Sequence, residues 1–257
     1  MPDMLEAQWT FTPREYFEEA VDLTSGDCTF AVTTGEVRGC GPLRTDDCHR
    51  ACKELHQRLD ALFLGAQMLE HQKYELSEPS QVVRVTPDGG RHNMVLPPAG
   101  IIALVQGRLD VVIKDDATGN VIRDDRRDRI SARLALSRSS AAHIDEPVAN
   151  SVIRSYAAAI NDPRNELVHL YEIRDALCTR FGGGPNARTA LGVSEPRWKD
   201  LGRLACFEPL LQGRHRGQHP ESLRPATPEE LSLAREIARE LVEKYLALLT
   251  KKGGTTP

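Results

Sequence analysis

The stretch RDDRRDR, residues Arg123–Arg129, divides this chain of 257 residues into two parts of different pattern. Before it, short runs rich in β-branched residues alternate with turn residues, which is typical of strands. After it, apolar residues recur every three or four positions, and this spacing indicates helices. The sequence therefore predicts the α+β class: an N-terminal antiparallel sheet with helices in residues 1–123, followed by an all-α helical bundle in residues 124–250.

The clearest feature of the front part is a predicted hairpin. The strand-like runs QVVRVT and RHNMVL flank Pro87-Asp88-Gly89-Gly90, where proline presets φ and the glycines accept a positive φ. Short turns of this kind favour antiparallel pairing, because a parallel partner needs a long crossover. Further strands are expected at Cys28–Val37, Ala99–Val105 and Leu109–Ile113.

Two helices are also expected in the front part. Thr12-Pro13-Arg14-Glu15 has the pattern of a capping box with proline at the first helical position, which predicts a helix start. A longer helix is predicted from a cap at Thr45 or Asp46 to about His71, because apolar residues recur there at helical spacing.

The back part is expected to contain helices only. Its breaks lie at Pro147, Asp162-Pro163, Gly182–Pro185 and Pro220. A second capping box, Thr227 to Glu230, introduces the last helix. Residues 251–257 are predicted to form a disordered tail. The expected helices are Ile130–His143, Ala149–Ile160, Pro163–Phe181, Glu195–Leu211 and Pro228–Leu249.

The first residues and the apolar runs bear on the cellular compartment. The N-terminal MPDMLEAQWTF lacks the basic and apolar regions of a secretory signal, and no apolar run approaches the ~18 residues that span a bilayer. We therefore expect a cytoplasmic protein with no membrane partner, whose six cysteines are mostly reduced.

The cysteines are the first place to look for a metal site. Cys28, Cys40, Cys48 and Cys52 lie near His49 and His56 in the sequence, yet they lack the C-x2-C knuckle of structural zinc sites. Cys48 and Cys52 also continue the apolar stripe of the long helix. The sequence therefore predicts packed thiols, no metal and no cofactor.

The helix predicted at Pro163–Phe181 contains two charged residues close to its apolar side. Arg174 falls inside the apolar arc and Glu166 lies at its edge, and a buried charge needs a partner. One interpretation is a buried polar cleft containing Arg174 and Glu166. The other is structural: an arginine–carboxylate bridge between helices, or an arginine whose charged end extends to solvent. The residues favour this structural interpretation.

A six-residue cluster, Arg214-His215-Arg216-Gly217-Gln218-His219, carries the functional hypothesis. Cleavage of a phosphodiester without a metal needs an imidazole to take the 2′-hydroxyl proton and a guanidinium to stabilise the charged phosphorane. Arg214 and His219 are the candidate catalytic pair, and His215 and Arg216 are candidate phosphate-binding residues.

Arg214-His215-x3-His219 resembles the R-(N/D/H)-x3-H motif of the HEPN ribonucleases, which are small helical bundles. The resemblance covers the C-terminal half only. It implies a metal-independent endoribonuclease that acts on RNA, usually as a homodimer, with the front domain regulating or recruiting. HEPN proteins carry the arginine and histidine on one helix, whereas Gly217 and Pro220 predict a loop here. The alternative is a non-catalytic module that binds nucleic acid or protein through the same basic loop.

Overall fold

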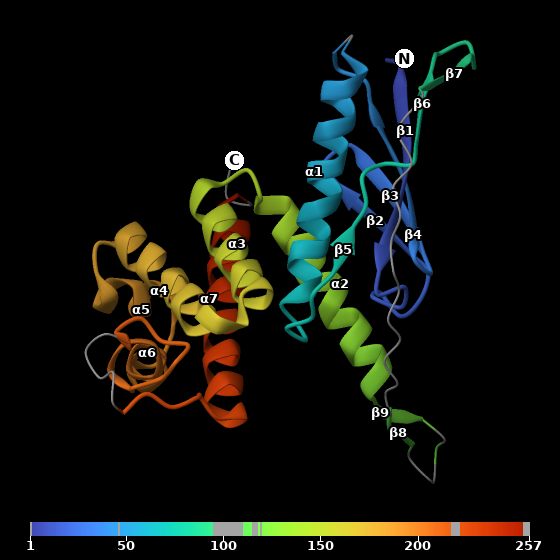
Figure 1. Cartoon of the computed structure of the whole chain (residues 1–257). Coiled ribbons are helices and arrows are strands. Elements are labelled where there is room, and N and C mark those ends of the chain that lie inside the picture. Colours follow the sequence, from blue (N-terminus) through green and yellow to red (C-terminus); the bar gives the residue numbers. More distant parts are fainter. Residues whose placement is uncertain are drawn as a thin grey trace. The chain divides into compact units, whose positions relative to one another are not determined.

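The computed structural model describes residues 2–45, 47–94, 110–114, 118, 120–216 and 222–253. The chain forms two compact units, one of residues 1–66 and 74–142 and one of residues 67–73 and 143–257. The first contains an antiparallel sheet and the second is helical (Figure 1), so the predicted α+β class is confirmed. None of the helices in the part that the structure describes is long and apolar enough to cross a membrane.

The main sheet has the strand order β2-β3-β4-β1-β6-β7, with β5 paired to the end of β1, and every pairing is antiparallel. The predicted hairpin is confirmed, because β6 and β7 pair across a turn in which Gly89 has a φ of +86°. The strands are β1 (Met4–Thr12), β2 (Val21–Ser25), β3 (Cys28–Thr33), β4 (Glu36–Pro42), β5 (Glu75–Leu76), β6 (Gln81–Val85) and β7 (Arg91–Met94).

Strand β1 lies in the middle of this sheet. Its apolar residues occupy alternate positions, and the side chains of Leu5, Ala7, Trp9 and Phe11 are all buried on one face. The helix predicted to begin at Thr12 is wrong, since residues 13–19 form turns and bends. Burial of the neighbouring aromatic side chains against the core overrides the helical capping pattern.

The other strand predictions are partly confirmed. The expected strand Cys28–Val37 is two strands, β3 and β4, because the chain reverses at Gly35, whose φ is +78°. A separate ribbon pairs β8 (Val112–Lys114) with β9 (Val121–Asp124). The strand predicted at Ala99–Val105 lies outside the described residues, as does Leu109.

Helix α1 (Cys48–Gln67) packs on the face of the sheet that β1 buries. The Phe63 ring lies 5.2 Å from the Phe11 ring and 5.3 Å from the Tyr16 ring, measured between centroids. The Asp47 carboxylate accepts from the backbone N–H groups of His49 and Arg50, so Asp47 caps α1 in place of the predicted Thr45 or Asp46.

Helix α2 (Asp125–His143) packs on α1. The Ser137 hydroxyl donates to the Leu62 carbonyl over 2.8 Å, and Arg133 donates to the Tyr16 carbonyl and forms an ion pair with Glu18. We expected the second domain to begin at residue 124. The structure places α2 with the sheet, and the second unit resumes at residue 143.

The second unit is built on α3 (Pro147–Asn161), α4 (Glu166–Phe181) and α7 (Pro228–Gly253), which pack on one another. Between α4 and α7 lie α5 (Gly184–Leu191), α6 (Glu195–Gly202) and a π-helix, η2 (Arg203–Phe207). A short 3-10 turn, η1 (Pro163–Asn165), precedes α4.

The helix ends both confirm and correct the sequence predictions. The Thr227 capping box is confirmed, because the Glu230 N–H donates to Thr227 and the Thr227 N–H donates to Glu230. The helix predicted at Glu195–Leu211 stops as an α-helix at Gly202, and α5 was not predicted. The predicted disordered tail is wrong at its start, since α7 runs to Gly253; residues 254–257 lie outside the description.

Candidate functional site

The predicted basic cluster follows η2, in the connection between α6 and α7. A π-helix is rare and occurs often at functional sites. After η2 the chain turns, and the Arg214 N–H donates to the Ala205 carbonyl over 2.8 Å, which holds the basic residues beside the π-helix. Arg214 and His215 thus lie in irregular structure and not on an α-helix, as the sequence indicated. His219 lies within residues 217–221, which are outside the described residues.

Arg214 is anchored to α4 by two contacts. Its Nη1 lies 2.7 Å from the Asp175 Oδ2, and its guanidinium carbon lies 4.7 Å from the centre of the Tyr171 ring. The hydrogen bond that Arg214 donates to Asp175 is the main cause that raises the pKa of Arg214. The side chain remains partly exposed, so this cation is oriented while it still faces solvent.

The two predicted phosphate-binding residues, His215 and Arg216, differ in their exposure. The Arg216 Nε donates to the Gly213 carbonyl over 2.9 Å, and its Nη2 donates to the side chain of Asn165. Arg216 is half-buried, whereas His215 is exposed. In the described part of the cluster, Arg214 and His215 are therefore exposed, and Arg216 supports the loop.

Two apolar side chains on the same segment of the chain are exposed. Phe207, the last residue of η2, is 77% exposed, and Leu211 is 43% exposed. Burying the exposed Phe207 ring against a ligand would contribute about 1.5–3 kcal/mol. We call Phe207, Leu211, Arg214, His215 and Arg216 the Arg214 surface.

Glu166 and Arg174, the residues of the predicted polar cleft, make their contacts with different neighbours. Glu166 is 1% exposed and accepts two hydrogen bonds from Arg235 of α7, of 2.5 and 2.8 Å. The His71 Nε2 lies 3.5 Å from the same carboxylate. The alternative interpretation, an arginine–carboxylate bridge between helices, describes Glu166 correctly, with Arg235 as the arginine.

Arg174 instead lies between aromatic rings. Its guanidinium carbon is 5.0 Å from the centre of the Tyr171 ring and 5.2 Å from that of the Trp198 ring. Its Nε is buried and has no hydrogen-bond partner among the described residues. Within the same described part of the chain, no carboxylate forms an ion pair with Arg174.

The thiols show no metal-binding arrangement in the described ranges. No group of three histidine, cysteine, aspartate or glutamate side chains in that part of the chain is placed to hold a metal ion. Cys52 is buried and Cys48 is half-buried. Burial raises the pKa of the Cys28, Cys40 and Cys52 thiols, so the protonated form is favoured.

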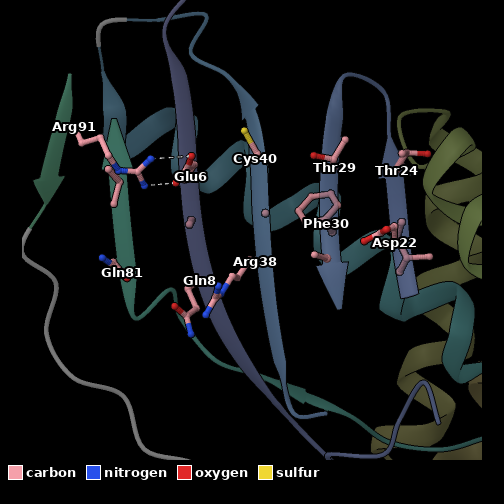
Figure 2. Close-up of a pocket in the computed structure, with 15 residues that line it drawn as sticks. Glu6, Gln8, Asp22, Thr24, Thr29, Phe30, Arg38, Cys40, Gln81 and Arg91 are labelled. Carbon is pink, nitrogen blue, oxygen red and sulfur yellow. Dashed lines mark hydrogen bonds and ion pairs between the residues drawn. The ribbon is translucent and has the colours of Figure 1, made fainter. Parts of the chain in front are cut away.

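A second candidate site is a hollow of about 740 Å³ on the sheet of the first unit. Its floor is the face opposite Trp9, where side chains from neighbouring strands form rows across the sheet (Figure 2). One row contains Gln81, Gln8, Arg38, Ala31 and Asp22, which are paired residues of successive strands. Its volume lies in the ~300–1,000 Å³ range of small-molecule pockets.

Two arginines of this hollow differ in their partners. Arg91 forms an ion pair with the Glu6 carboxylate at 2.5 Å (Figure 2), whereas Arg38 is exposed and has no ion pair among the described residues. Sequence reasoning missed this site, because β1 and β2 were not predicted. The alternation of apolar and polar residues in Met4–Thr12 was the available signal.

Comparison of the chain with models of protein families, with curated proteins and with solved structures gives no match.

Proposed function

We propose that the helical unit binds single-stranded RNA through the Arg214 surface. The observation that carries this proposal is that the exposed ring of Phe207 and the exposed, oriented guanidinium of Arg214 belong to two segments joined by the Ala205–Arg214 hydrogen bond. Proteins that bind single strands combine aromatic side chains, on which bases stack, with cations that contact the phosphates. Phe207 and Arg214 supply one group of each kind within a few residues of the Ala205–Arg214 hydrogen bond.

The anchoring of Arg214 supports this proposal further. Ordering a long side chain on binding opposes association, by roughly 0.5–1.5 kcal/mol for each immobilised side chain. Asp175 and Tyr171 already restrict the Arg214 side chain before any ligand arrives. Arg214 therefore meets a phosphate with less loss of conformational entropy than a free surface arginine.

Fluorescence anisotropy with a labelled single-stranded RNA oligonucleotide tests this proposal. We expect Phe207→Ala to weaken binding about tenfold, since a stacked base contributes ~1–3 kcal/mol. Arg164 is an exposed arginine of the same unit, outside the Arg214 surface, and Arg164→Gln serves as the control. Equal affinities of the wild type and Phe207→Ala would contradict the role of Phe207.

We propose as a second function that this unit is a HEPN-like, metal-independent endoribonuclease. In this reaction His219 takes the proton of a ribose 2′-hydroxyl, and the oxygen attacks the adjacent phosphorus. The P–O5′ bond breaks, the leaving 5′-oxygen takes a proton from water, and a 2′,3′-cyclic phosphate remains. Arg214 stabilises the extra negative charge on phosphorus, and its anchoring by Asp175 supports that role.

Cleavage is tested by incubating RNA with the protein in EDTA at neutral pH. The expected result is a 2′,3′-cyclic phosphate end for the wild type and none for His219→Ala. Arg214→Ala should slow cleavage by roughly 10²-fold or more, and Arg214→Lys should restore the rate only in part. If both the wild type and His219→Ala bind RNA but neither cleaves it, the surface is a binding module only.

The sheet unit has a regulatory or recruiting role in this proposal. The hollow that contains Arg38 is the place where a small ligand would bind. The homodimer implied by the HEPN resemblance belongs to the same proposal, and sedimentation equilibrium of the whole chain tests it directly.

A further inference from the structure

We propose that Arg174 is a second phosphate-binding residue, which holds the phosphate next to the one at Arg214. The inference rests on the proposed binding of RNA, and it adds a contact from outside the Arg214–His219 cluster. Arg174 lies on α4, 40 residues before Arg214 in the sequence, yet both guanidinium groups lie over the Tyr171 ring. Their distances to its centre, 5.0 and 4.7 Å, place the two cations within about 10 Å of each other.

The hydrogen-bonding state of Arg174 is the main evidence. A guanidinium has five N–H donors, and the buried Nε has no partner in the described part of the chain. A buried donor without a partner costs about 1–3 kcal/mol, so such groups in folded proteins call for a missing acceptor. Arg174 as a whole is only partly buried, and an anion that reaches its guanidinium from solvent would supply the opposite charge.

The surroundings of Arg174 hold the side chain in place without neutralising it. The Tyr171 and Trp198 rings attract the cation through their π-electrons, and an aromatic ring cannot accept as a carboxylate does. Asp175, the adjacent residue in the sequence, forms its ion pair with Arg214. The positive charge of Arg174 thus remains uncompensated within the described residues.

Gly202, the last residue of α6, makes this position possible. A Cβ added there would lie 2.6 Å from the Arg174 Nη1, which is closer than real contacts allow. Any other residue at 202 would therefore displace the guanidinium. Gly202→Ala should remove the proposed contact without changing the charge of the protein.

Phosphate contact has a consequence that a purely structural arginine lacks. Each phosphate neutralised on a single strand releases counterions, so the slope of log Kobs against log[salt] changes by about 0.7 for each contact. Arg174→Gln should reduce the magnitude of the slope by ~0.7 and weaken RNA binding about tenfold at 0.1 M salt. Gly202→Ala should weaken binding in the same direction. Arg164→Gln, which removes the same charge from an exposed position, should leave the slope nearly unchanged.

The fluorescence of Trp198 gives a second readout that does not depend on RNA. The chain has two tryptophans, and Trp9 is buried in the sheet unit, so a Trp9→Phe background isolates Trp198. Titration with inorganic pyrophosphate should change this fluorescence in a saturable way, and the change should be lost in Arg174→Gln. Circular dichroism of each variant checks that the helical fold is retained.

The outcomes separate this inference from the proposed function. If the wild type binds RNA, and Arg174→Gln keeps the wild-type affinity and salt slope, the inference is overturned and RNA binding stands. If the wild type does not bind RNA, the proposed function fails. The anion site at Arg174 then stands only if pyrophosphate changes the Trp198 fluorescence in an Arg174-dependent way, and it is overturned otherwise.

Discussion

The Glu166 carboxylate of the helical unit is fully buried, and its environment keeps a neighbouring histidine neutral. Arg235 donates two hydrogen bonds to Glu166, and His71 approaches the same carboxylate from the segment 67–73. Burial lowers the pKa of His71 to about 4, although the Glu166 charge acts in the opposite direction. Desolvation of the imidazolium exceeds the attraction to a carboxylate that Arg235 already neutralises.

The titration of His71 predicts how stability depends on pH. An unfolded histidine has a pKa near 6.5. Between pH 6.5 and 4 the unfolded chain therefore binds a proton at His71 that the folded chain does not bind. The contribution of neutral His71 to the free energy of unfolding should be fully present above pH 6.5. The free energy of unfolding should then fall as the pH drops toward 4. Urea unfolding at a series of pH values measures this fall.

His71→Asn is the matched variant, because asparagine tolerates the positive φ of 52° at this position and carries no charge. Its stability should change less than that of the wild type between pH 6.5 and 4. Parallel pH profiles for the two proteins would show that His71 is not the titrating group.

Sequence reasoning at this scale identified Arg174 and Glu166 but named no partner for either residue. Helical spacing placed Arg174 inside the apolar arc of α4 and Glu166 at its edge, and both side chains contact other helices of the unit. The arginine that binds Glu166 lies 69 residues later in the chain, on α7, and a single helical pattern contains no information about such a partner. The contact of His71 with Glu166 could not be predicted for the same reason.

At the scale of elements, the crossing of α1 and α2 depends on one glycine. A Cβ at Gly65 would lie 2.4 Å from the Leu136 carbonyl oxygen and 2.7 Å from the Ser140 hydroxyl. Gly65→Ala should destabilise the sheet unit by roughly 1–3 kcal/mol, as overpacking does, although alanine favours a helix. Thermal or urea unfolding measures the loss, and the larger Gly65→Val should lose more. An increase in stability with Gly65→Ala would contradict this close approach.

Local signals predicted elements well where they were not opposed by packing. The Pro87–Gly90 turn and the Thr227 capping box both formed as their residue types require. The capping pattern at Thr12 failed, because Tyr16 and Phe17 are buried among other aromatic rings and take the chain out of a helical path. The π-helix η2 has no sequence signature of its own, so the exposure of Phe207 could not be predicted.

At the scale of the whole molecule, the order of the chain does not follow the order of the two units. Residues 67–73 come from the front part of the sequence and belong to the helical unit. There, the Tyr156 hydroxyl donates to the Met68 carbonyl over 3.3 Å, and Arg239 donates to the Leu69 carbonyl over 2.8 Å. The sequence predicted one boundary near Arg123, because a change of pattern along the chain cannot reveal an inserted segment.

This assignment predicts which unit a substitution in the segment will destabilise. Met68 has no exposed surface, and replacing a buried methionine by alanine typically costs 2–5 kcal/mol.

Each unit has one tryptophan, Trp9 in the sheet unit and Trp198 in the helical unit. Trp198→Phe therefore leaves Trp9 as the reporter of the sheet unit, and Trp9→Phe leaves Trp198 as the reporter of the helical unit. In urea, Met68→Ala should lower the midpoint that Trp198 reports and leave the midpoint that Trp9 reports unchanged. Gly65→Ala should do the reverse, which makes the two substitutions controls for each other. A shift of the Trp9 midpoint alone with Met68→Ala would assign residues 67–73 to the sheet unit, because a buried side chain stabilises the unit whose core it fills.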